Sequence, residues 1–94
     1  MNQLISNAEA RDKVIAAIGA ARAKGNAGAA DGANSKTWKR GRKAVFAYGS
    51  GFSIVLVYND SSFGFDVLRF YGPDGVVCHE EAAGDDRLAE IGGF

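Results

Sequence analysis

Hydrophobic and polar positions follow a helical period in the first quarter of the chain. Apolar side chains recur at spacings of three and four residues, which places on one helical stripe Ala10, Val14, Ile18 and Ala21. Ser6 precedes this stripe and Glu9 follows three residues later, in the order of a capping box, so we expect Ser6 to cap the helix. Gly25 is typical of the position just beyond a helix end. The pattern predicts a helix over residues 7–24.

Residues 25–36 show neither a periodic pattern nor a bulky side chain. Small and polar side chains bury too little area to offset the entropy of ordering a segment of this length. The composition therefore predicts a long, flexible loop, which separates the helical pattern from a region with a different period.

From residue 43 onward the hydrophobic pattern alternates with a period of two, which is typical of β-strands. Turn-forming residues divide this region, and the clearest turn is Gly72-Pro73-Asp74-Gly75. The alternation and the turns predict strands at residues 43–48, 52–59, 63–71 and 76–80. Residues 85–91 carry acids at their start and favour a short C-terminal helix.

These elements predict one α+β domain over residues 1–94, with an N-terminal helix followed by an antiparallel meander of three or four strands. The segment 52–59 is apolar on both faces, as in a central strand that is covered on both sides. One Ala-rich helix covers one face at most, so we expect the loop, the C-terminal turn or another chain to cover the second. We place on that second face Val55, Val57, Leu68 and Phe70, or the opposite set.

Length and composition suit a small globular protein, with 94 residues of which 47% are hydrophobic and 23% charged. No apolar run approaches the roughly 18 residues of a membrane helix, and the start of the chain lacks the basic and apolar regions of a signal peptide. The single Cys78 has no partner for an internal disulfide. We therefore expect a cytoplasmic protein, located in the host cytoplasm if a phage encodes it, with no membrane partner.

The formal net charge is zero, but residues 1–43 carry nine Lys or Arg against three acids, and residues 44–94 carry two against eight. Five cations surround one tryptophan within eight residues, and they define a candidate partner-binding site: Lys36, Trp38, Lys39, Arg40, Arg42 and Lys43. Cations neutralise phosphates and a Trp ring stacks on bases, while the same residues also suit an acidic protein surface. The alternative is a solvated strand entry whose cations face the acidic half of the folded chain.

The run Cys78-His79-Glu80-Glu81 combines residue types that catalysis and metal binding use. On a regular strand Cys78 and His79 point to opposite faces and cannot act together, and the pairs that share a face offer only two ligands. We expect a buried Cys78 and an exposed His79. The acids of the C-terminal half lack the spacing of an EF-hand. The sequence therefore predicts a non-enzymatic protein without a cofactor or a metal.

Together these features favour an interaction protein. In size and composition, though in no motif, the chain resembles the small inhibitors encoded by phages and mobile elements, such as anti-CRISPR proteins. The resemblance implies a compact α+β domain that blocks a larger host protein or ribonucleoprotein complex sterically or electrostatically, and it assigns a role to no individual residue. Two alternatives stay open: a nucleic-acid-binding module that uses residues 36–43, and a homodimer or larger assembly that pairs through the sheet.

Overall fold

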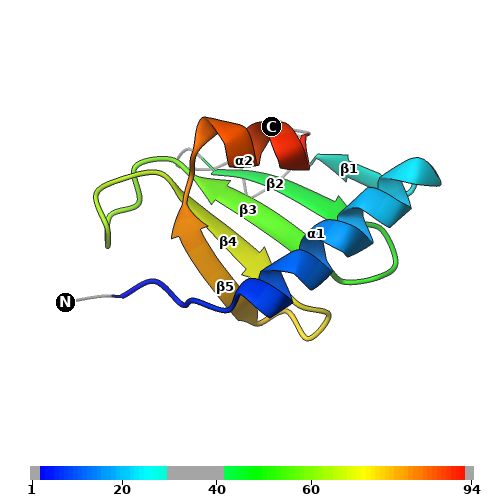
Figure 1. The fold of residues 1–94 in the computed structure, drawn as a ribbon, viewed down its shortest axis with the longest axis horizontal. Coiled ribbons are helices and arrows are strands. Elements are labelled where there is room, and N and C mark those ends of the chain that lie inside the picture. Colours follow the sequence, from blue (N-terminus) through cyan, green and yellow to red (C-terminus); the bar gives the residue numbers. More distant parts are fainter. Residues whose placement is uncertain (1–2, 30–41, 93–94) are drawn as a thin grey trace.

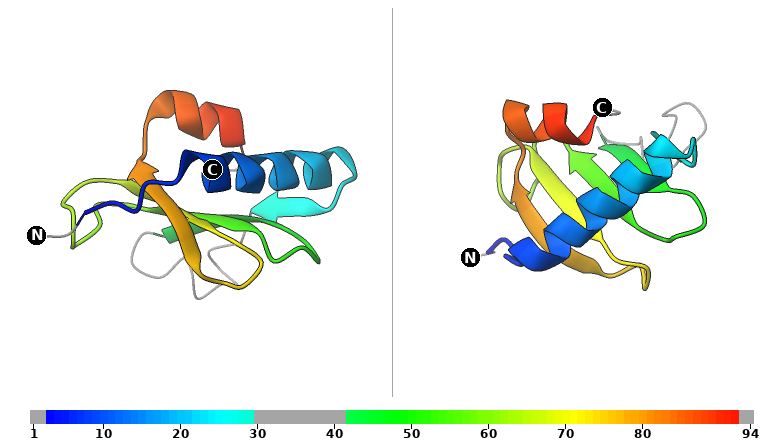
Figure 2. Two further views of the ribbon diagram at one scale, coloured as in Figure 1. Left: turned by 60° about the horizontal axis from the view of Figure 1, so that its bottom comes forward. Right: turned by 45° about the vertical axis from the view of Figure 1, so that its right-hand side comes forward.

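The computed structural model describes residues 3–29 and 42–92. In chain order the elements are α1 (Ala8–Ala23), β1 (Ala27–Ala29), β2 (Arg42–Ala47), β3 (Ser53–Val57), β4 (Val67–Tyr71), β5 (Val77–Ala82) and α2 (Asp85–Ile91). The strands form one open antiparallel sheet in which every neighbour in space is also the neighbour in sequence. Both helices lie on one face of this sheet, with α1 running diagonally across the strands (Figures 1 and 2). The expected α+β fold with a C-terminal helix is confirmed, and the sheet has one strand more than predicted.

Helix α1 has Asn7 as its N-cap, so the expected cap at Ser6 is wrong. The side-chain oxygen of Asn7 accepts a hydrogen bond from the N–H of Ala10 at 3.0 Å. Asn and Ser cap helices about equally well, so residue preference does not distinguish Asn7 from the adjacent Ser6. The choice depends on the residue at which the helix begins. The predicted apolar stripe is confirmed at its centre, where Val14 and Ile18 are buried.

The main core lies between the helices and the sheet. It consists of buried residues from both helices and from the three central strands: Val14, Ile18, Val45, Ala47, Ile54, Leu56, Leu68, Phe70 and Ile91. Burying a side chain of the size of Ile or Phe contributes roughly 1.5–3 kcal/mol each. Because Ile91 of α2 belongs to this core, α2 covers the same face of the sheet as α1. Neither helix covers the opposite face of the sheet.

The strand register assigns the two faces of the sheet. Val57 pairs with Val67, and Val55 and Val57 lie on the face away from the helices, in a smaller apolar cluster. Leu68 and Phe70 pack instead in the main core. The expected grouping of these residues on one face is wrong. The alternation of side chains shows which residues of one strand point the same way. The loop between two strands sets their register, and the register determines which residues of the second strand point to that same face of the sheet.

Strand β1 lies inside the predicted loop 25–36. Its residues pair with β2, and Gly28 stands opposite Phe46. A three-residue segment of Ala and Gly has no side-chain alternation, so no pattern in the sequence indicates this strand. The remainder of the predicted loop, from residue 30, lies outside the described residues.

Strand β4 begins at Val67, and not at residue 63 as predicted. The segment before it, residues 58–66, forms the connection from β3. Gly64 has a φ of 77°, a left-handed value that a strand does not contain. The alternating Phe63 and Phe65 therefore belong to a loop, although their spacing is that of a strand.

Strand β5 contains a β-bulge. Phe70 pairs with His79 and Tyr71 with Val77, which leaves Cys78 as an extra residue opposite β4. The bulge interrupts the alternation of side chains. Cys78 packs against the main core, and the ring of His79 meets the core residue Phe70 edge to face, with centroids 5.3 Å apart. Both side chains thus lie on the helix side, and the expectation that they point to opposite faces is wrong.

Candidate functional site

Four residues of the predicted partner-binding site lie outside the described residues: Lys36, Trp38, Lys39 and Arg40. Arg42 and Lys43 are the first two residues of β2 and are both half-buried. Successive residues of a strand point to opposite faces. Arg42, which pairs with Val57, lies on the face away from the helices, and Lys43 lies on the helix face. The structure therefore does not bring these two cations together.

Alternate residues of β2, continued into the following turn, form a row on the face away from the helices: Arg42, Ala44, Phe46 and Tyr48. Tyr48 is 58% exposed, and its ring meets that of Phe46 edge to face, with centroids 4.9 Å apart. The Tyr48 hydroxyl lies over Gly28, where an added Cβ would come within 2.7 Å of it. The aromatic end of this row was not among the predicted site residues, although it continues the alternation that starts at Arg42.

The centre of the same face is apolar. Ala44, Val55 and Val57 are buried there, and Tyr71 packs half-buried beside them. Neither α1 nor α2 lies on this side of the sheet (Figure 2). Neither described helix covers this face, yet the apolar centre is buried, so its accessible side chains lie at the two ends of the β2 row: the half-buried Arg42 and the exposed Tyr48.

A buried ion cluster lies on the same face. Arg69 of β4 pairs with Asp60 of the β3–β4 loop and with Glu80 of β5, with N–O distances of 2.7 Å to each. Burial alone would raise the pKa of Asp60, but the bonds from Arg69 and from the Ser62 N–H outweigh burial and lower that pKa. The other oxygen of Glu80 accepts the Ile5 N–H at 3.1 Å. The cluster is a structural tie between the loop, the sheet and the N-terminal segment.

Glu81 joins both helices to β5. Its Oε1 lies 3.0 Å from Nε2 of His79 and 3.7 Å from Arg11 of α1, and its Oε2 accepts from Arg87 of α2 at 2.9 Å. Nδ1 of His79 accepts the N–H of Asn7 at 2.8 Å, so we assign the imidazole proton to Nε2. Both ring nitrogens of His79 are thus engaged in holding elements together.

Cys78 and His79 share a face but do not form a catalytic pair. His79 is 5% exposed, so its expected exposure is wrong, because the bulge turns the ring into the core. Cys78 is half-buried and its thiol donates to the carbonyl of Phe70 at 3.3 Å. Burial, together with the charge of Asp74, raises the pKa of this thiol and disfavours the nucleophilic thiolate. In the part of the chain that the structure describes, no three His, Cys, Asp or Glu side chains gather to hold a metal.

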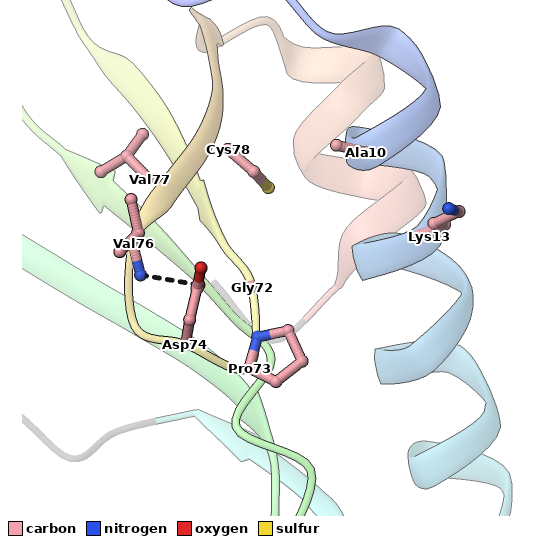
Figure 3. A pocket seen from close by; sticks show the side chains of 8 residues that line it. All are labelled: Ala10, Lys13, Gly72, Pro73, Asp74, Val76, Val77 and Cys78. Atoms are coloured by element: carbon pink, nitrogen blue, oxygen red, sulfur yellow. Dashed lines mark hydrogen bonds between the residues drawn. The ribbon is translucent and has the colours of Figure 1, made fainter.

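An open groove of about 540 Å³ lies between α1 and the β4–β5 turn, and Cys78 points into it from β5 (Figure 3). Its polar side chains are already occupied. Lys13 pairs with Glu9 at 3.7 Å, and the Asp74 carboxylate accepts the N–H of Val76 at 3.0 Å. The groove therefore lacks converging polar groups that would orient a small ligand.

No protein-family model matches the chain, and searches of curated proteins and of solved structures find no match either. Over the described ranges, no helix has the length and apolar character required to cross a membrane. The function is consequently inferred from the geometry of the two sheet faces and from the distribution of charge.

Proposed function

We propose that this chain is a non-enzymatic binding protein that docks on a larger protein through the sheet face away from the helices. The row on β2 supports this proposal most directly. It carries Arg42 and the exposed Tyr48 at the two ends of a face with an apolar centre and no described helix over it. Arg and Tyr are enriched among the residues that dominate binding energy at protein interfaces.

The partner surface that fits this face is acidic opposite Arg42. Arginine binds carboxylates through two parallel hydrogen bonds, which makes it specific as well as attractive. The sequence places three further cations within six residues before Arg42: Lys36, Lys39 and Arg40. We propose that the chain blocks such a partner sterically or electrostatically, as a phage-encoded inhibitor of a host protein or ribonucleoprotein complex does.

Affinity capture with matched variants tests the proposal. Immobilised wild-type protein should retain a partner from an extract of the native host, and Arg42→Glu and Tyr48→Ala should each retain much less of it. Lys13→Glu reverses a charge on α1, where the side chain is 71% exposed, and serves as the control that should bind normally. Equal retention by the wild type and by both face variants would contradict the proposal.

Nucleic acid is a second candidate partner, favoured by the Phe46–Tyr48 ring pair on a sheet face. Aromatic rings on an open sheet stack on unpaired bases in single-strand-binding modules. This candidate predicts a gel shift with single-stranded RNA or DNA at low salt, with an affinity that falls steeply as salt is added. If the protein shifts neither the RNA probe nor the DNA probe at low salt, nucleic acid is excluded as the partner.

A further inference from the structure

The β3–β4 loop, residues 58–66, is closed by hydrogen bonds around Asp60. The backbone N–H of Asp60 donates to the carbonyl of Phe65 at 3.0 Å. The carbonyl of Asp60 accepts from the N–H groups of Phe63 and Gly64, at 3.2 and 2.7 Å. These bonds fix both ends of the segment that carries the two phenylalanines.

Side chains complete the order of this loop. The Asp60 carboxylate accepts the Ser62 N–H at 2.8 Å and pairs with Arg69, and the Asp66 carboxylate accepts the Asn59 N–H at 2.7 Å. Asn59 has a φ of 47°, and among the described residues it is the one non-glycine with a positive φ. After glycine, asparagine is among the residues that adopt this left-handed conformation most readily, so its side chain suits the turn. The loop is thus built to hold one shape.

This shape presents aromatic rings to the outside. Phe65 is 42% exposed and Tyr58 is 40% exposed. Phe63 is half-buried and lies tilted against Phe65, with ring centroids 5.8 Å apart. Single exposed apolar residues are ordinary, but rigid aromatic residues on an ordered loop are typical anchors of interfaces, because they bury much area at a small cost in entropy.

The loop lies at the end of the sheet where β2 begins. Arg42 pairs with Val57, the last residue before the loop. The loop projects beyond the strand ends, between β3 and β4 in Figure 1. Ile5, 47% exposed, is tied to this end as well, because Glu80 bonds both its N–H and the Arg69 that holds the loop. An aromatic anchor and Arg42 are therefore available to one partner.

Charge identifies the kind of surface that fits the rings. From residue 44 to residue 68 the sequence contains no Lys or Arg, so the loop itself carries no cation and Arg42 of β2 lies at its base. A loop that inserts into an anionic membrane or between bases typically carries cations of its own. Of the two acids on the loop, Asp60 is neutralised by Arg69, whereas Asp66, next to Phe65, is exposed and accepts the Asn59 N–H. The other polar residues near the rings are the uncharged Asn59, Ser61 and Ser62. A negative charge beside Phe65 disfavours phosphate groups and anionic headgroups. An apolar pocket of a protein is the environment that matches.

We propose that the β3–β4 loop is a preformed anchor that inserts Phe65, supported by Phe63, into an apolar pocket of the partner protein, beside the acidic surface that faces Arg42. This inference rests on the proposed binding function. It adds the β3–β4 loop to the sheet face that carries Arg42 and Tyr48 as a second part of the interface. Because the loop is ordered before it binds, association loses little conformational entropy. Phe65→Ser should weaken binding by at least about tenfold.

Photo-crosslinking with competition tests the anchor. A benzophenone amino acid in place of Phe65 should give one discrete adduct with a protein of the native host extract. Unlabelled wild-type protein should suppress this adduct, and Phe65→Ser should need at least about ten times the concentration to do so. Val76→Ser removes a side chain that is 61% exposed on the β4–β5 turn, and this control should compete like the wild type. Circular dichroism of each variant confirms that it is folded.

Several outcomes would overturn the anchor: no protein adduct, an adduct with a second copy of this chain, a lipid or nucleic-acid adduct only, or equal competition by Phe65→Ser and the wild type. The Arg42→Glu competitor separates the two proposals. If it fails to compete while Phe65→Ser competes fully, the binding face stands and the anchor is wrong. If both compete fully, both proposals are wrong.

Discussion

The backbone N–H of Asn7 donates to Nδ1 of His79 at 2.8 Å, and this bond fastens the start of α1 to the edge strand β5. The opposite ring nitrogen lies 3.0 Å from Glu81, which also contacts Arg11 and Arg87. A single imidazole thus connects a helix N-terminus to the acid that joins both helices to the sheet. The role is structural, and it predicts a loss of stability when the ring is removed.

His79→Ala should lower the free energy of unfolding by about 2–4 kcal/mol, because it leaves a hydrogen-bond cluster without its centre and opens a cavity beside Phe70. Urea denaturation followed by circular dichroism measures this change. His79→Gln, which keeps a hydrogen-bond acceptor, should lose less. Equal stability of His79→Ala and the wild type would show that the cluster contributes nothing.

The identity of the N-cap can be tested with two adjacent substitutions. Asn7→Ala should destabilise the protein by about 1 kcal/mol, because the N–H of Ala10 loses its acceptor. Ser6→Ala should change stability by less than about 0.5 kcal/mol, because Ser6 is exposed and is not the cap. Thermal unfolding of the two variants distinguishes these positions, and the reverse order of effects would restore Ser6 as the cap.

Asp60 makes stability depend on pH on the acid side. Its pKa in the folded state is below the ordinary value near 3.9 of an unfolded chain. The carboxylate therefore stabilises the fold fully above about pH 4–5, and this contribution is lost as the pH falls through the lowered pKa. Asp60→Asn should cost stability at neutral pH, and its difference from the wild type should shrink below about pH 4. Urea titrations at several pH values measure the difference, and one that is constant with pH would contradict the assignment.

Gly51 and Gly49 form a matched pair in the β2–β3 turn. Both have left-handed φ values, 80° and 78°, so an alanine costs about 1 kcal/mol at either position. A Cβ on Gly51 would also come within 3.0 Å of the Pro73 backbone, whereas a Cβ on Gly49 meets open space. Gly51→Ala should therefore be more destabilising than Gly49→Ala by about 1–2 kcal/mol in chemical denaturation. Equal losses would mean that the two turns do not pack together.

Local signals in the sequence predicted the parts of this fold that depend on neighbouring residues. The stripe of Val14 and Ile18 and the turn at Gly72-Pro73-Asp74-Gly75 are examples, since helix faces and tight turns depend on short segments. Features that depend on a distant partner strand were missed. Strand β1 exists because β2 offers an edge, and the bulge at Cys78 is visible only opposite β4.

The candidate site shows the same division. Arg42 and Lys43 looked like one basic cluster in the sequence, but strand geometry sends them to opposite faces. Phe65 matched a strand pattern, and only the bonds around Asp60 reveal a loop that displays it. Composition located a region rich in cations, whereas three-dimensional pairing determines which side chains share a surface.

The order of the elements along the chain has a consequence for synthesis. Each strand pairs with its neighbour in sequence, so successive hairpins can form while the chain emerges from the ribosome. Helix α1 is made first, but Val14 and Ile18 share their core with Leu68 and Phe70, which are made fifty or more residues later. During that interval only the part of the native cover that β2 and β3 supply has been made, so the apolar stripe of α1 is incompletely covered and the nascent chain is prone to aggregate or to recruit a chaperone.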